Sequence, residues 1–154
     1  MAAGPFEGGG GIFIFSTTSV EEAKQWLSTD PGVQANRWII EVLPFTMRQG
    51  AICKLEAPYE MVSYHFIRFR AVVTKTTAQD FPDLIRRHDD YLKTIAATGN
   101  VLIEGTFGDN EGGMMVMRGD LDAAVFEHDP AVQEELVQAE KKVLYIAKGA
   151  FCEK

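Results

Sequence analysis

The sequence has little of what marks several common classes of protein. No stretch approaches the ~20 consecutive apolar residues that a membrane-spanning helix needs. Lys and Arg do not gather into the basic cluster that nucleic acid or anionic lipid requires, and the formal net charge of −7 would repel a phosphate backbone. The N-terminus has neither the basic flank nor the apolar run of a signal peptide. We therefore expect a cytoplasmic protein that binds neither membranes nor nucleic acid.

Cysteine and histidine are also scarce. The only two cysteines, Cys53 and Cys152, form no CxxC or Cys/His pattern, and free thiols in a reducing compartment are expected. The three histidines do not stand at the spacing of metal ligands. Residues 8–11, although glycine-rich, do not follow a strand and open a helix as a phosphate loop does, and they are predicted to be a hairpin turn. We expect neither a metal nor a cofactor.

What is present indicates an α+β protein. The 154 residues are 46% apolar, which is enough for a core without further cross-links. Residues 12–15 read as a buried strand, Ser19 and Glu22 form a capping box that starts a helix, and residues 37–45 read as a second strand. Residues 1–46 are thus predicted to be a β-α-β half-unit, and residues 47–60 a linker.

Residues 61–154 are predicted to form a complete unit. Residues 61–73 alternate like a strand, Asp80 caps a helix that Gly99 ends, and Pro130 lies in a second helix that runs to about residue 141. The remaining strands are expected at 100–107, 114–117 and 143–151. The order β-α-β-β-α-β suggests a ferredoxin-like fold with helices on one face of an antiparallel sheet.

The two ends of the chain match each other. Turn, strand, helix and an Asp-Pro-x-Val-Gln motif follow one another at residues 4–34 and again at residues 105–133, at an offset near 100 residues. Such an ordered match indicates an internal repeat.

Three segments of the 61–154 unit carry a family resemblance. His88-Asp89-Asp90-Tyr91-Leu92, then residues 99–105 (GNVLIEG), then Asp129-Pro130 resemble the motifs of the YciI-like (YCII-related) family. The resemblance implies a dimeric α+β barrel built from ferredoxin-like units. It covers residues 61–151 as a complete unit and residues 3–45 as half of another.

The N-terminal copy lacks the first strand and the histidine-bearing helix. Either Met1 is an internal methionine of a longer protein, which we favour, or another subunit completes the half-unit. A bare β-α-β unit leaves backbone groups unpaired and an apolar face uncovered. We therefore expect a homodimer.

Helical spacing places His88 among apolar residues that face the sheet. On spacing alone it is a core histidine with a satisfied hydrogen bond, and Asp129 is a helix cap. The resemblance implies that the two form a catalytic pair, in which the carboxylate fixes the imidazole tautomer. Arg68 and Arg70 share one face of their strand, where they either bind a substrate anion or pair with acidic residues. Tyr91 either rims a pocket or packs.

The resemblance thus implies a cofactor-independent acid–base enzyme of the lyase or isomerase type, acting on a small cyclic or aromatic molecule. His88 and Asp129 would be catalytic, and Arg68, Arg70 and Tyr91 would bind substrate. The alternative is a non-catalytic module that binds a small ligand or another protein through the same cleft.

Overall fold

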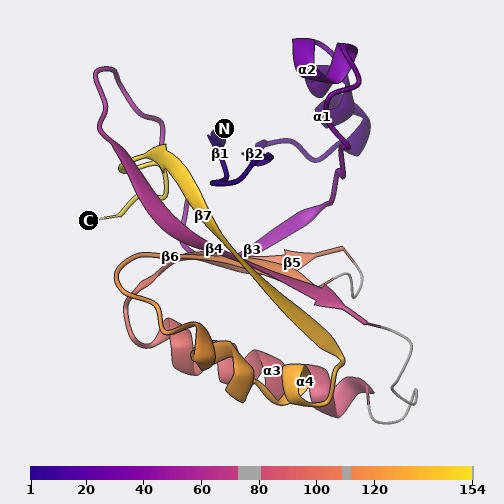
Figure 1. The fold of residues 1–154 in the computed structure, drawn as a ribbon, viewed down its shortest axis with the longest axis vertical. Coiled ribbons are helices and arrows are strands. Elements are labelled where there is room, and N and C mark those ends of the chain that lie inside the picture. Colours follow the sequence, from indigo (N-terminus) through magenta and orange to yellow (C-terminus); the bar gives the residue numbers. More distant parts are fainter. Residues whose placement is uncertain (73–80, 109–111, 154) are drawn as a thin grey trace.

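The computed structural model of the chain describes residues 1–72, 81–108 and 112–153. Five strands form one antiparallel sheet in the order β3-β5-β6-β4-β7 (Figure 1). The longest strands are β4 (Met61–Ala71) and the edge strand β7 (Val137–Ala147), which pair over eleven residues each, from Met61↔Ala147 to Ala71↔Val137. The strands are β3 (Phe45–Gln49), β4 (Met61–Ala71), β5 (Val101–Phe107), β6 (Gly113–Met117) and β7 (Val137–Ala147).

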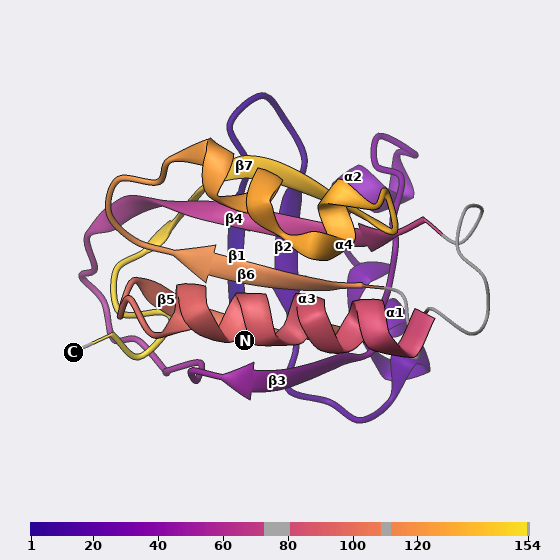
Figure 2. The ribbon, with the colours of Figure 1, turned by 90° about the horizontal axis from the view of Figure 1, so that it is seen from below.

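Helices cover one face of this sheet. α3 (Phe81–Ala96) lies along it, and the 3₁₀ helix η1 (Ala123–His128) and α4 (Pro130–Gln133) lie beside α3 (Figure 2). Along α3, buried side chains recur every three or four residues, which is the spacing of one helix face. The helix-side core contains Ile67, Phe69, Leu84, Leu92, Ile95, Val101, Met115, Met117, Phe126, Ala131, Leu136 and Val137.

An N-terminal hairpin covers part of the opposite face. β1 (Ala2–Pro5) and β2 (Gly11–Ile14) pair with each other and cross the strands of the large sheet (Figure 2). The ring of Phe6 lies 4.8 Å from that of Phe66 on β4, and Ile12 and Ile14 pack on the same core. α1 (Val20–Leu27) and α2 (Pro31–Gln34) extend from this hairpin on the side away from α3 (Figure 1).

The sequence predicted much of the 61–154 region. The strands at 61–71, 101–107 and 113–117 and the helix at 81–96 lie where they were expected. The turn predicted at residues 8–11 joins β1 to β2. The predicted cap Asp80, the last residue of the 61–73 strand and residues 109–111, between the strands predicted at 100–107 and 114–117, lie outside the described residues.

The strand predicted at residues 37–45 is wrong. Residues 37–44 form no strand, and β3 begins at Phe45 instead, across the predicted boundary between residues 46 and 47. The indole of Trp38 lies against Gly32 in α2, where an added Cβ would be 1.8 Å from its Nε1. Pro44 has no N–H to donate to a ladder. β3 pairs with β5, so this strand belongs to the large sheet and completes no N-terminal β-α-β unit.

Two further expectations are corrected. The helix predicted to reach residue 141 ends at Gln133, because Glu135 has a positive φ of 57° and the chain then enters β7, whose eleven residues all pair with β4. The cysteines are not free, since Cys53 and Cys152 form a disulfide with Cα atoms 5.1 Å apart. Persistent disulfides are typical of oxidising compartments, so the cytoplasmic location stays a prediction.

Among the described residues, no helix combines the length and the apolar character needed to cross a membrane.

Candidate active site

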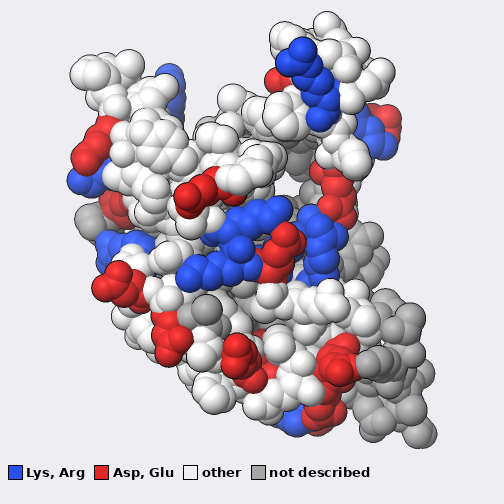
Figure 3. Space-filling view, viewed as in Figure 1, with Lys and Arg blue, Asp and Glu red and all other residues white. Residues whose placement is uncertain are grey.

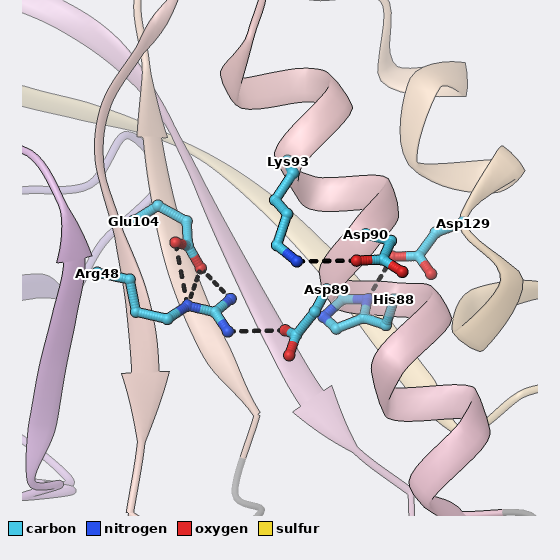
Figure 4. A network of polar contacts seen from close by, with 7 residues as sticks. All are labelled: Arg48, His88, Asp89, Asp90, Lys93, Glu104 and Asp129. Atoms are coloured by element: carbon cyan, nitrogen blue, oxygen red, sulfur yellow. Dashed lines mark hydrogen bonds and ion pairs between the residues drawn. The ribbon is translucent and has the colours of Figure 1, made fainter.

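A buried histidine–aspartate pair joins α3 to the start of α4. His88 Nδ1 lies 2.6 Å from Asp129 Oδ2 (Figure 4). Asp129 is completely buried and His88 is 7% exposed. The pair predicted from the sequence is therefore in hydrogen-bond contact, although the two residues are 41 positions apart.

Local structure fixes each partner. Asp129 is the N-cap of α4, and its other oxygen, Oδ1, accepts a hydrogen bond from the Ala131 N–H at 2.9 Å. Pro130 follows at the first helical position, where its missing N–H costs nothing. His88 lies on the buried stripe of α3, and the ring of Phe69 on β4 meets its imidazole edge-on at 5.2 Å. Capping and orienting the histidine are thus done by two different oxygens of one carboxylate.

This arrangement selects one tautomer of His88. An ionised carboxylate is only an acceptor, so Nδ1 carries the proton that it donates to Asp129. The lone pair is then on Nε2, which in Figure 4 lies on the side of the ring toward Asp89 and Arg48. Chemically, such a pair can take up a proton at Nε2 and stabilise the resulting imidazolium with the carboxylate.

Tyr91 lies near Asp129, and its hydroxyl already makes a hydrogen bond within the protein. The hydroxyl donates to the Val125 carbonyl at 2.5 Å, which ties α3 to η1. Burial and the negative charge of Asp129 raise the pKa of Tyr91. Of the two predictions for Tyr91, the contact supports packing.

Arg68 and Arg70 do not lie with His88. Alternation along β4 directs Ile67 and Phe69 to the helix side and the two arginines to the opposite face. Arg68 donates to both oxygens of Glu41, at 2.6 and 2.8 Å, and its guanidinium lies 5.5 Å from the ring of Phe107. Basic and acidic side chains meet in the hollow between the sheet and the N-terminal segment (Figure 3). Arg70 lies 3.9 Å from Glu41 and 3.8 Å from Glu140, so both arginines pair with acidic residues, which is one of the two expectations for them.

A second polar network, which the sequence did not indicate, flanks the histidine. Arg48 on β3 binds Glu104 on β5 through Nε, at 3.1 and 3.2 Å, and through a second nitrogen at 2.5 Å (Figure 4). It also reaches Asp89, the neighbour of His88, at 2.7 Å. Burial lowers the pKa of Arg48, but the hydrogen bonds to Glu104 and Asp89 outweigh this effect, and the pKa is raised. One cation therefore ties an edge strand, a central strand and α3 together.

The local sequence did not connect Arg48 with Glu104. Glu104 is 56 residues from Arg48 in the sequence. It is 7% exposed and is the only charged residue of β5. The available signal was the alternation at residues 45–49, which separates Phe45 and Met47 from Thr46 and Arg48. Among the described residues, no group of three or more His, Cys, Asp or Glu side chains could hold a metal ion.

Comparison with known proteins adds no relative. No family model matches the chain, and no curated protein and no solved structure is significantly similar to it.

Proposed function

We propose that the chain is a YciI-like protein and a cofactor-independent acid–base enzyme of the lyase or isomerase type. Its substrate would be a small cyclic or aromatic molecule. His88 would move the proton and Asp129 would orient and charge-stabilise the imidazole. The observation that carries the proposal is the 2.6 Å contact between His88 Nδ1 and the buried carboxylate of Asp129.

The strand arrangement supports the ferredoxin-like part of the proposal. β4 and β5 both pair antiparallel with β6, which lies between them, and β6 and β7 both pair antiparallel with β4. Two β-α-β units that each leave a gap filled by a strand of the other are the pattern of a split β-α-β fold. The homodimer belongs to the same proposal, and light scattering at micromolar concentration tests it. A clean monomer would contradict it.

In the proposed reaction, His88 Nε2 accepts a proton from a carbon of the ring substrate. The electron pair of that C–H bond enters the ring. An isomerase then returns the proton to another atom, whereas a lyase expels a leaving group that takes a proton from the imidazolium. Asp129 stays ionised throughout, and its carboxylate stabilises the imidazole most strongly when the imidazole is protonated. A positioned general base of this kind contributes roughly 10²–10⁴ in rate.

The alternative, a non-catalytic module that binds a small ligand or another protein, is supported by the burial of the imidazole. At 7% exposure, little of the His88 surface is open to a substrate in this conformation. A pair that acts only as a structural link between α3 and α4 would look the same. The two proposals differ in whether Nε2 exchanges protons with a bound molecule.

Proton exchange separates the two proposals even while the product is unidentified. We would incubate the protein in D₂O with a panel of small cyclic ketones, lactones and enols and follow loss of C–H signals by NMR. His88→Asn should lower the exchange rate by roughly 10²-fold or more. His128→Asn is the matched control, because it makes the same change at an exposed histidine next to Asp129 and should have no effect. Exchange that persists in His88→Asn would refute the catalytic proposal.

A further inference from the structure

Two helical turns 99 residues apart have the same backbone. Asp30 caps α2 with φ −69° and ψ 128°, and Asp129 caps α4 with φ −65° and ψ 124°. Each cap is followed by Pro, and each turn ends at a left-handed residue, Asn36 with φ 53° and Glu135 with φ 57°. These shared angles support the internal repeat and make α2 the counterpart of α4.

The strands before these turns correspond as well. β2 and β6 each follow a glycine with positive φ, Gly10 at 77° and Gly112 at 92°. At this offset of 102 residues, Phe13 and Phe15 are the counterparts of Met115 and Met117. The elements that cover Met115 and Met117 in the C-terminal unit therefore indicate what kind of element would cover Phe13 and Phe15 in the N-terminal unit.

In the C-terminal unit this surface is covered. Met115 is completely buried and Met117 is 4% exposed, in a core shared with Phe126 and with the apolar stripe of α3. α3 also supplies His88 to Asp129. α3 thus provides both the apolar cover for this surface and the histidine that binds the capping aspartate.

The N-terminal unit leaves the same surface open. Phe13, Phe15 and Leu27, the last being the counterpart of Phe126, line an open groove of about 500 Å³. Trp26 and Asp30 line it too, and Phe13 and Trp26 are 51% and 43% exposed. The rings of Phe13 and Phe15 stack at 5.9 Å, so the groove has an ordered aromatic wall.

The strand edge and the capping carboxylate are open in the same way. β6 lies between β5 and β4, whereas β2 pairs only with β1 within the described part of the chain. Asp30 Oδ1 accepts from the N–H groups of Gly32 and Val33, and for Oδ2 no hydrogen bond is found among the described residues. The corresponding oxygen of Asp129 holds His88.

We propose that this groove is the docking site for a strand followed by an amphipathic helix of the same chemistry as β4 and α3. The strand pairs with the open edge of β2. The helix lays its apolar stripe on Phe13, Phe15 and Leu27 and directs a histidine to Asp30 Oδ2. The docking does not depend on the proposed function. Only a catalytic role for the second histidine would depend on that function.

The test supplies such a strand and helix in cis. Leu102 is the counterpart of Met1 at the offset of 101 residues that relates Gly4 to Gly105, so a second copy of residues 61–101 is fused directly before Met1. Covalent linkage removes the entropic cost of association that a free peptide would have to overcome. A Trp38→Phe background leaves Trp26 as the only tryptophan, because the chain has two.

We expect the extension to shift the Trp26 emission to shorter wavelength and to protect it from acrylamide quenching. The matched control carries Asp in place of the two leucines of the extension that copy Leu84 and Leu92, and Trp26 should stay exposed there. In the extended chain, Asp30→Asn should lower the melting temperature more than it does in the parent chain.

Unchanged Trp26 emission and quenching in the extended chain would overturn the proposal. It would also be overturned if Trp26 of the unextended chain became buried with rising concentration as light scattering showed dimers, because a second copy would then occupy the groove. Neither readout uses catalytic activity or alters His88, so failure here is distinguishable from failure of the proposed function.

Discussion

The pairing of His88 with Asp129 can be weighed against an internal reference, because the chain contains the same aspartate cap twice. In Asp129→Asn, one amide group faces two donors, the Nδ1–H of His88 and the N–H of Ala131. Asn offers one acceptor oxygen and one donor NH₂, so it satisfies one of them only, unless the imidazole changes tautomer. A buried donor without a partner costs about 1–3 kcal/mol.

Asp30→Asn is the control. Both of its backbone hydrogen bonds go to one oxygen, Oδ1, which the amide retains. Asn and Asp are nearly equal as N-caps, so the change should cost only about 0.3 kcal/mol. The difference between the two variants therefore isolates the contact with His88 from the cap that both positions share.

Urea unfolding followed by far-UV circular dichroism measures this difference. With a slope of about 1–3 kcal/mol/M, the expected loss moves the midpoint of Asp129→Asn by roughly 1 M below that of Asp30→Asn. Long-range ¹H–¹⁵N spectra of the His88 ring should at the same time show the proton on Nδ1 in the parent chain. Equal midpoints for the two variants, with the proton still on Nδ1 of His88 in Asp129→Asn, would refute the reasoning that the carboxylate of Asp129 holds the imidazole.

Three further changes have expected outcomes. Arg48→Ala leaves the buried carboxylate of Glu104 without its cation and should lower the free energy of unfolding by about 1.5–3 kcal/mol in urea titrations, with partial recovery in the double variant with Glu104→Gln. The hydrogen bond from Arg68 holds the pKa of Glu41 below its ordinary value of 4.5, so this pair stabilises the fold above pH 4.5 and less as the pH falls. Glu41→Gln should therefore reduce the stability lost between pH 6 and pH 3, by less than about 1 kcal/mol because the carboxylate is half exposed. Reduction of the disulfide, which closes a loop of 99 residues, should lower stability by up to about 4.7 kcal/mol in the chain-entropy account, and unfolding with and without a reductant checks it.

The sequence predicted the elements whose pattern is local. The alternation of residues 61–71 and the i, i+4 spacing of Leu84, His88 and Leu92 place side chains on the faces that the structure gives them. The same spacing directed His88 inward, and the Asp-Pro cap marked the start of α4. The contact between these two residues came from the family resemblance and not from the spacing itself.

What the sequence did not predict depends on contacts between distant segments. Residues 37–44 carry the apolar character of a strand, yet Trp38 packs on Gly32 and the edge of the sheet is taken by residues 45–49. Residues 137–141 follow a helical turn, yet their pairing with β4 makes them a strand. The Arg48–Glu104 pair and the disulfide join positions 56 and 99 residues apart, which no periodicity connects.

The N-terminal hairpin has a consequence for how copies of this chain could associate. β1 and β2 already lie on the face of the sheet that bears Phe66, Val116 and Leu144. The sheet of a second copy and the hairpin cannot cover this face at the same time. Self-association through the sheet must therefore either displace the first fifteen or so residues, at the expense of contacts such as Phe6 on Phe66, or be confined to the area that the hairpin leaves bare.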